Sequence, residues 1–363
     1  LRRESFLTLL QLQKSLRNHS KQIFNYNLNV MPIRPNNFAI AALIALAIEI
    51  FPASLADEGF SIEETDFGLT VKYDGELVTN YVVDQANKPY LWPFIGPTGK
   101  EMTRAYPMKE VDGEQFDHPH HRSIWFGHQS INGFDTWLEL RTGTEKKLDA
   151  DKLTAFKRKI GRTVHREFSQ INANEKRAIF KTRNDYVGSD GKKLMSDERT
   201  IVIRKTKNQV VLDFDISFIA EYGNVRVGDI KDAGLSVRIP SAMALKEGKG
   251  GRIFNSEGIR DSDTWSKRAA WVDYHGPLEG DHLGIAILNH PSSFRHPTPW
   301  HVRDYGLFTA NPFGFNSLDK SRADKTFTLT EGTRFFMKHR IIFHKGNTEQ
   351  AKIAQAFERY ARQ

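Results

Sequence analysis

The feature that most constrains the fold is a period-two alternation of apolar and polar residues, which recurs along most of the chain after residue 57. In the segment 210–218, for example, Asp213 and Asp215 fall opposite the apolar positions. Successive side chains of a strand point to opposite faces, so the pattern predicts strands with one solvated face. The clearest strands are predicted at residues 69–73, 199–204, 210–218 and 335–343.

Turns rich in Gly, Asp and Asn separate the predicted strands, at residues 74–75, 188–191, 207–208 and 248–251. Only one helix is predicted, at the C-terminus, with Asn347 or Thr348 as its cap. Its apolar stripe has helical spacing and consists of Ile353, Ala356, Phe357 and Tyr360. Helices and strands do not alternate, which argues against a parallel nucleotide-binding sheet. We therefore predict an all-β protein, a large antiparallel β-sandwich with a C-terminal helix.

The N-terminal part has the pattern of a secretory signal peptide over residues 31–56. Met31 and Arg34 form a weakly positive start, residues 38–48 form an apolar run, and Ala56 ends a small-x-small cleavage pattern. The run is too short for a spanning helix; the alternative is a signal-like anchor that stays attached. Residues 1–30 begin with Leu1 and are interpreted as an over-extended reading frame. We thus expect a periplasmic or secreted protein whose residues 57–363 form a single domain, with no membrane span after cleavage.

Charge and cysteine content exclude several classes of function. The chain has no cysteine, which rules out disulfides, thiolate metal sites and cysteine nucleophiles. Its 52 Lys and Arg residues exceed its 44 Asp and Glu residues, but six of the basic and two of the acidic residues lie within 1–56. The remainder is only weakly basic and its charges are well mixed, so no nucleic-acid partner is predicted.

A histidine cluster marks the first candidate site, since four of the 13 histidines lie between residues 118 and 128. Histidine suits proton transfer and metal ligation because its ordinary pKa lies near neutrality. On extended backbone His118 and His120 would share a face while His121 pointed the other way. Proton transfer or substrate binding is the first interpretation; zinc-type ligation and purely structural histidines are the alternatives.

Two further segments carry similar residues. In 226–232, Asp229 and Lys231 are two apart and would face the same way on a strand. The segment 290–304 is again rich in His, Trp and Arg. A weaker candidate consists of residues 255–257 and 265–271, with Glu257 as its acid–base residue. The predicted catalytic residues are His118, His120, His121, His128, Asp229, Lys231 and His301. The predicted substrate-binding residues are Arg122, Trp125, Asn132, Glu257, His290, Trp300 and Arg303.

These motifs resemble those of the bacterial family labelled PmoA-like, or methane-oxygenase-like, over about residues 89–314. The resemblance rests above all on the motifs at 117–122, 255–258, 267–274, 300–306 and 310–314. Its label implies a metal-dependent oxygenase, and its all-β pattern is similar to the galactose-mutarotase-like fold. At 230–233 this chain has Ile-Lys-Asp-Ala where the family usually has Thr-Lys-Glu-Gly. The resemblance supplies no settled set of catalytic residues.

Three functions remain open from the sequence. The first is an exported carbohydrate-active enzyme of the epimerase, lyase or hydrolase type with a saccharide substrate. The second is a non-catalytic glycan-binding or scaffold protein, and the third is a metal-dependent oxygenase. The sequence identifies no cofactor. The enzyme hypothesis requires that the segments around residues 118, 229 and 301 line one common site.

Overall fold

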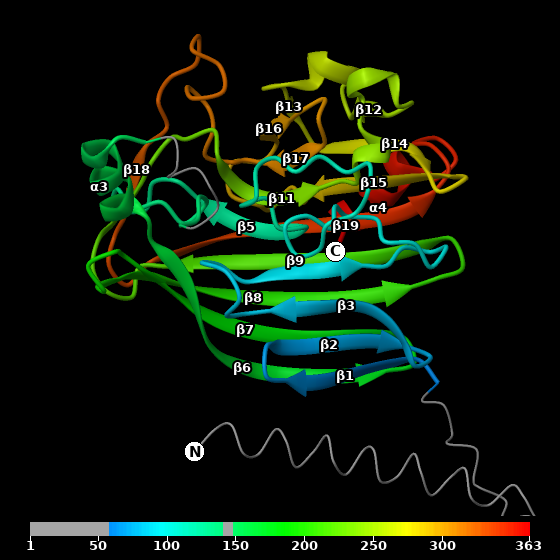
Figure 1. The fold of residues 1–363 in the computed structure, drawn as a ribbon, viewed down its shortest axis with the longest axis horizontal. Helices are drawn as coiled ribbons and strands as arrows, with labels where there is room; N and C mark the ends of the chain where they lie inside the picture. Colours follow the sequence, from blue (N-terminus) through cyan, green and yellow to red (C-terminus); the bar gives the residue numbers. More distant parts are fainter. Residues whose placement is uncertain (1–57, 141–147) are drawn as a thin grey trace, which may run out of the picture. The chain divides into compact units, whose positions relative to one another are not determined.

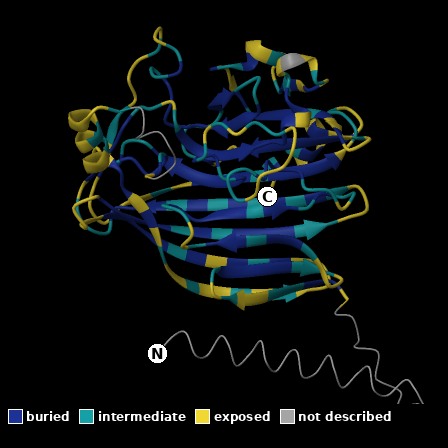
Figure 2. Ribbon diagram, viewed as in Figure 1, coloured by how far each residue is buried: buried dark blue, intermediate teal, exposed yellow. Residues whose placement is uncertain are grey.

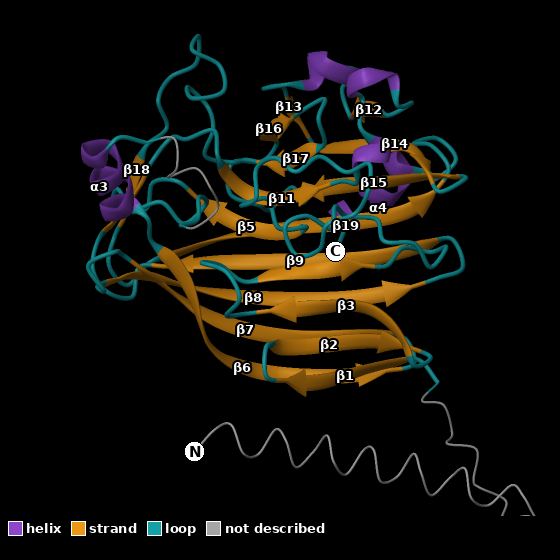
Figure 3. Cartoon of the chain, viewed as in Figure 1, coloured by secondary structure: helices purple, strands orange, loops and turns teal. Residues whose placement is uncertain are grey.

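A computed structural model describes residues 58–140 and 148–363. The predicted signal peptide at 31–56 and the preceding residues 1–30 lie outside the described residues. Strands dominate the described chain (Figure 3), and every strand pair in its sheets is antiparallel. The predicted all-β class is therefore confirmed.

The first sheet has nine strands (Figure 1). In spatial order they are β1 (Phe60–Thr65), β2 (Gly68–Tyr73), β3 (Glu76–Val82), β4 (Tyr90–Phe94), β5 (Ile124–His128), β11 (Ala233–Arg238), β17 (Leu307–Ala310), β16 (Thr298–Val302) and β13 (Arg268–Ala269).

The second sheet has eight strands, and a separate two-stranded sheet pairs β10 (Val225–Val227) with β18 (Phe327–Leu329). The eight strands in spatial order are β12 (Arg252–Asn255), β14 (Trp271–Leu278), β15 (Asp281–Asn289), β19 (Arg334–Lys345), β9 (Gln209–Ile219), β8 (Lys193–Lys205), β7 (Arg177–Val187) and β6 (Arg162–Asn174). Short 3-10 helices occur at Ser241–Met243, Lys246–Gly248 and Asp261–Thr264.

The two large sheets pack face to face around the main core (Figure 2). Phe94 of the first sheet stacks on Phe343 of the second at 4.0 Å, and Phe126 contacts Phe218 edge to face at 5.4 Å. The alternation predicted these faces correctly, because Phe214 and its even-numbered neighbours on β9 are buried in the core. The predicted β-sandwich is thus confirmed.

The C-terminal helix α4 (Ile353–Ala361) is confirmed, but its predicted start is wrong. The helix begins after Lys352, which is in the left-handed conformation at the N-cap. Asn347 instead accepts backbone hydrogen bonds from Glu349 and Gln350, so it caps the preceding turn. The buried stripe of α4 covers the outer face of the second sheet.

A second helix, α3 (Ala150–Lys159), was not predicted. Asp149 caps it by accepting a hydrogen bond from the Lys152 amide at 2.9 Å, and none of its residues is buried. A helix without a buried face has no apolar stripe to detect. Among the described residues, no helix combines the length and apolar character needed to cross a membrane.

One glycine in the first sheet is required by a close approach of the backbone. Gly234 on β11 has φ +114°, and a Cβ atom there would overlap the carbonyl oxygen of Ala310 on β17. We expect Gly234→Ala to lower the free energy of unfolding in urea by about 3 kcal/mol or more, from strain and steric overlap. Gly191→Ala is the control, because its φ is also positive but its surroundings are open; a loss of only about 1 kcal/mol is expected there. Equal losses would contradict the account.

Candidate active site

The candidate site lies on the outer face of the first sheet. Strand register places five residues side by side across β4, β5, β11, β17 and β16, and directly paired residues share a face. In order, this row consists of Tyr90, Trp125, Ser236, Thr309 and His301. The intervening positions of these strands face the main core. The row therefore brings segments near residues 125 and 301 onto one surface.

A carboxylate–imidazole pair stands at this face. Asp117 Oδ2 lies 2.8 Å from His118 Nδ1, while Oδ1 accepts hydrogen bonds from Arg104 at 2.5 Å and from Arg238 at 2.7 Å. Both arginine side chains are fully buried, whereas 42% of the His118 side chain is exposed. These contacts hold the pKa of Asp117 below its usual range: the hydrogen bond with His118 and the charge of Arg238 outweigh burial. An ionised carboxylate thus orients an accessible imidazole, whose Nε2 is left for a ligand.

Four aromatic rings stack from the sheet outward through this pair. Trp125 stacks on His121 at 5.2 Å, His121 on His118 at 4.8 Å, and His118 on Tyr305 at 5.3 Å. Trp125 and His121 are buried, and Tyr305 is half-buried. Trp125, a predicted substrate-binding residue, therefore supports the stack from below.

The expectation that His121 points away from His118 is wrong. His118 has φ +42°, and its carbonyl accepts a hydrogen bond from the His121 amide at 2.9 Å, so the backbone turns here. The His120 ring meets those of His118 and His121 edge to face, at 5.8 and 4.6 Å. Burial lowers the pKa of His120 to about 3. The turn thus brings all three rings into contact.

His301, on β16, enters the same site. Its Nδ1 donates to the Lys231 carbonyl at 2.8 Å and lies 3.5 Å from Asp232 Oδ1. Burial lowers the pKa of His301 to about 3, and the charge of His118 contributes to the decrease. At neutral pH the ring is therefore uncharged. Because Nδ1 keeps its proton to donate to the Lys231 carbonyl, the free lone pair of the neutral ring is on Nε2.

Two partly exposed aromatic rings and an arginine complete the site. The Arg303 guanidinium lies 4.5 Å from the Trp265 ring centre and 5.6 Å from that of Tyr305. Trp265 in turn meets His301 edge to face at 4.7 Å. Burial raises the pKa of Asp232, against the opposing charge of Lys231. His118, Tyr305, Arg303, Trp265 and His301 are thus linked by successive contacts.

Two predicted site residues point into the core instead. Trp300 is fully buried beside His301, on the opposite face of β16, and donates its indole N–H to the Ala269 carbonyl at 2.9 Å. His128 is fully buried on β5, where its Nδ1 accepts a hydrogen bond from the Ser130 amide at 2.9 Å. Strand alternation separates each of them from the outer face.

Three other predicted residues have contacts outside this group. His290 meets Tyr360 of α4 edge to face at 4.9 Å. Glu257 is exposed in a turn after β12, and Asn132 is exposed and accepts a hydrogen bond from the Arg226 amide at 2.7 Å. No contact of the described residues connects these side chains to the Asp117–His118 pair.

The predicted pairing of Asp229 with Lys231 is also wrong, because residues 229–232 do not form a strand. The Asp229 carboxylate accepts hydrogen bonds from the amides of Asn316, Ser317 and Lys325, and so fixes that loop. Lys231 contributes its carbonyl to His301, while its side chain is exposed.

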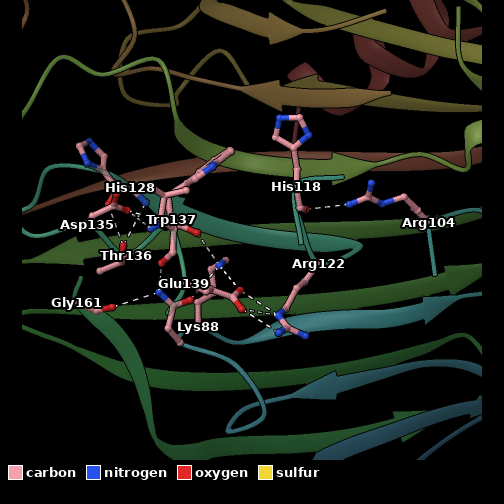
Figure 4. A network of polar contacts seen from close by, with 12 residues as sticks. Lys88, Arg104, His118, Arg122, His128, Asp135, Thr136, Trp137, Glu139 and Gly161 are labelled. Carbon is pink, nitrogen blue, oxygen red and sulfur yellow. Dashed lines mark hydrogen bonds and ion pairs between the residues drawn. The ribbon is translucent and has the colours of Figure 1, made fainter. Parts of the chain in front are cut away.

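A buried ion network lies close to the histidine cluster (Figure 4). Lys88 donates to Glu139 at 2.7 Å and to the Trp137 carbonyl at 2.8 Å, and Arg122 binds both oxygens of Glu139. Arg122 also lies 5.4 Å from the Tyr90 ring centre. Arg122, a predicted substrate-binding residue, is therefore engaged by Glu139.

The buried histidines give stability a definite pH dependence. Burial lowers the pKa of His128 to about 3 from 6.5. Between these values the unfolded state binds a proton that the folded state does not, so the stabilising contribution is complete above pH 6.5 and falls as the pH decreases. At pH 5 the lost contribution is about 2 kcal/mol. Urea unfolding at pH 7.5 and pH 5 measures the effect. Between these pH values, the free energy of unfolding of His128→Leu should decrease by about 2 kcal/mol less than that of wild type, because leucine does not titrate. Identical pH profiles would contradict this prediction.

Sequence reasoning missed several residues of the site. They are Arg104, Asp117, Asp232, Arg238 and Tyr305, whereas Trp265 begins the weaker candidate segment 265–271. Asp117 and Tyr305 could have been found, since Asp117 directly precedes His118 and Tyr305 lies two residues after Arg303. Arg238 carried no local signal, because it reaches Asp117 from β11, more than a hundred residues away. Among residues 58–140 and 148–363, no group of three or more His, Asp or Glu side chains is arranged to hold a metal ion.

The fold and the site define an antiparallel β-sandwich with an imidazole–carboxylate site on one sheet face. The chain belongs to the Family of unknown function (DUF6807), whose family model matches residues 68–358. The resemblance to the methane-oxygenase-like family is therefore wrong, because the family whose model matches the chain is DUF6807. A comparison with curated proteins gave no match.

Similar solved structures include three proteins described as sugar enzymes. A galactose mutarotase related enzyme from Lactobacillus acidophilus is 9% identical, with a TM-score of 0.34, covering 79% of this chain and 97% of its own. A putative aldose 1-epimerase from Escherichia coli K12 is 9% identical, with a TM-score of 0.30 and coverages of 50% and 69%. The GH36 α-galactosidase AgaA from Geobacillus stearothermophilus is 11% identical, with a TM-score of 0.37 and coverages of 81% and 41%.

Proposed function

We propose that this protein is a carbohydrate-active enzyme that interconverts isomers of a saccharide by proton transfer. The observation that carries the proposal is the Asp117–His118 pair. Two fully buried arginines hold the carboxylate, yet the imidazole that it orients is exposed. Burying guanidinium groups costs free energy unless they are well paired. An accessible imidazole fixed by such an arrangement is typical of an acid–base residue.

The surroundings of the pair suit a sugar. Tyr305 and Trp265 are both partly exposed, and aromatic faces complement the apolar C–H faces of a pyranose. Beside these rings lie His301 and Asp232, which can bind hydroxyl groups. A few polar groups next to aromatic surfaces are what orient a small polar ligand.

The two imidazoles suggest complementary roles. Neutral His301 can accept a proton at Nε2 from the anomeric hydroxyl, while protonated His118 donates one from its Nε2 to the ring oxygen. The bond between the anomeric carbon and the ring oxygen breaks in the same step and leaves an open-chain aldehyde. Asp117 would stabilise the charged form of His118, and Asp232 the charge that forms on His301. The reverse transfer closes the ring on either face.

Hydrolysis of a glycoside fits the site less well. Glycosidases generally use two carboxyl groups that flank the scissile bond. Of the two carboxyl groups at this site, Asp117 is engaged by Arg104, Arg238 and His118. Isomerisation by two imidazoles requires no second free carboxyl group.

Exchange NMR tests the proposal. The full chain is incubated with aldohexoses and hexuronates, and the rate of α/β interconversion is measured for wild type and for His282→Gln. His282 is an exposed histidine paired with His275 in the second sheet, so it serves as the control. Acceleration of at least one sugar by both proteins is expected. Sugar binding without acceleration would instead support a glycan-binding module and contradict the proposed enzyme.

A further inference from the structure

Arg303 has a conformation suited to a ligand oxyanion. Its guanidinium lies over the rings of Trp265 and Tyr305, with its central carbon 4.5 and 5.6 Å from their centres. Within the described residues, no carboxylate forms an ion pair with it and no side chain or carbonyl accepts a hydrogen bond from its guanidinium. The N–H groups of a half-buried guanidinium are thereby left for a ligand.

From this arrangement we propose that the substrate is an acidic saccharide, whose oxyanion binds Arg303. The inference rests on the proposed function, because it assigns the substrate class of the same site. A planar guanidinium presents paired N–H donors that match the two oxygens of a carboxylate, sulfate or phosphate group. The contacts with Trp265 and Tyr305 restrict the side chain of Arg303 and so reduce the entropy lost on binding.

The charge balance of the site supports an anionic ligand. Among the described residues, Asp117 is the one carboxylate that forms an ion pair with Arg104 and with Arg238. Positive groups therefore outnumber negative ones: Arg104, Arg238, Arg303 and Lys231 against Asp117 and Asp232. A surplus of positive charge around a partly buried site raises the local concentration of anions.

Other arginines that lie over aromatic rings are arranged differently. Arg295 lies over Phe294 at 4.6 Å, but it donates hydrogen bonds to the carbonyls of Pro312 and Lys325. Arg260 lies over Phe254 at 5.3 Å and is exposed. Arg303 combines two ring contacts, partial burial and proximity to His301 and Asp232, whose pKa values its charge lowers.

Calorimetric titration of the full chain tests the inference. The probes are glucuronate, galacturonate and mannuronate, each beside its neutral parent sugar, together with galactose 6-sulfate and galactose 6-phosphate. For wild type we expect at least one acidic sugar to bind about ten-fold or more tightly than its parent. The relative affinities of carboxylate, sulfate and phosphate sugars then distinguish the three sources of the oxyanion. Arg303→Gln should bring the ratio of the affinity for the acidic sugar to that for its neutral parent close to one. Arg303→Lys should keep part of this preference for the acidic sugar. The control Arg260→Gln should keep the wild-type ratio.

Equal affinity for acidic and neutral sugars, a ratio that survives in Arg303→Gln, or no binding of any acidic sugar would overturn the inference. Failure of the proposed function gives a different result. Selective binding of an acidic sugar without isomerisation would contradict the proposed enzyme activity but support binding of the acidic sugar by Arg303. Isomerisation of neutral sugars with no preference for acidic ones would support the proposed enzyme activity but contradict the acidic substrate.

Discussion

Replacement of Lys88 by methionine is expected to lower the free energy of unfolding by about 3 kcal/mol, because it breaks a buried ion pair. The Lys88 side chain is fully buried, and its ammonium donates to Glu139 at 2.7 Å, to the Trp137 carbonyl at 2.8 Å and to Asn87 Oδ1 at 3.0 Å. Burial lowers the pKa of Lys88, and the charge of Glu139 opposes that shift. In the variant, the buried negative charge of Glu139 loses the neighbouring positive charge of Lys88. The Trp137 carbonyl also loses the hydrogen bond that the ammonium donates.

Urea unfolding at pH 7 measures the effect, with Lys192→Met as the matched control. Lys192 forms an exposed pair with Asp190 at 3.7 Å, and 81% of its side chain is exposed. Exposed pairs contribute little, so a change within about 0.5 kcal/mol is expected for the control. A Lys88→Met variant as stable as the control would show that the network does not stabilise the fold.

His118→Gln is expected to lower the rate of saccharide isomerisation by about 10²- to 10⁴-fold, the usual contribution of a positioned acid–base residue. Glutamine can still hydrogen-bond to Asp117 but cannot carry the proton. Because 42% of the His118 side chain is exposed, the free energy of unfolding should change little. The sugar affinity should fall much less than the rate, because the remaining contacts of the site stay in place.

The comparison with His282→Gln separates catalysis from general effects of removing a histidine. His282 is exposed and contacts His275 at 2.8 Å, in the second sheet. Its variant should keep the wild-type rate and the wild-type pH profile. Equal rates for the His118 and His282 variants would remove His118 from the chemistry.

The strands could be predicted because their signal is local. The alternation at 210–218, for example, depends only on which face of β9 is buried, and both the strand and its faces are confirmed. The α3 helix lacks any buried face, and its ends are set by a cap that is weak evidence on its own. The C-terminal helix was found from its stripe, whereas its start depends on the conformation of Lys352.

The site could be predicted only in part, because its assembly depends on strand register. The pairing of Trp125 with Ser236, of Ser236 with Thr309 and of Thr309 with His301 brings residues 125 and 301 onto one face. Register of this kind is not visible in a single sequence. Successive side chains of β16 point to opposite faces of the sheet, so His301 faces the site while its neighbour Trp300 faces the core.

The motif around residue 118 misled in a different way. Its histidines were interpreted on extended backbone, but the left-handed conformation of His118 turns the chain and stacks His118 on His121. Asp117 was overlooked because its importance depends on Arg238, which reaches it from β11. The residue types were therefore informative, while their roles required the contacts.

A crystal structure of the protein soaked with a saccharide that it binds tests the central claim most directly. The account predicts a sugar ring against Tyr305 and Trp265, with hydroxyl or ring oxygens within hydrogen-bond distance of Nε2 of both His118 and His301. Sugar density confined to another part of the surface, such as the roughly 480 Å³ cavity lined by Arg252, Arg260 and His275, would contradict it.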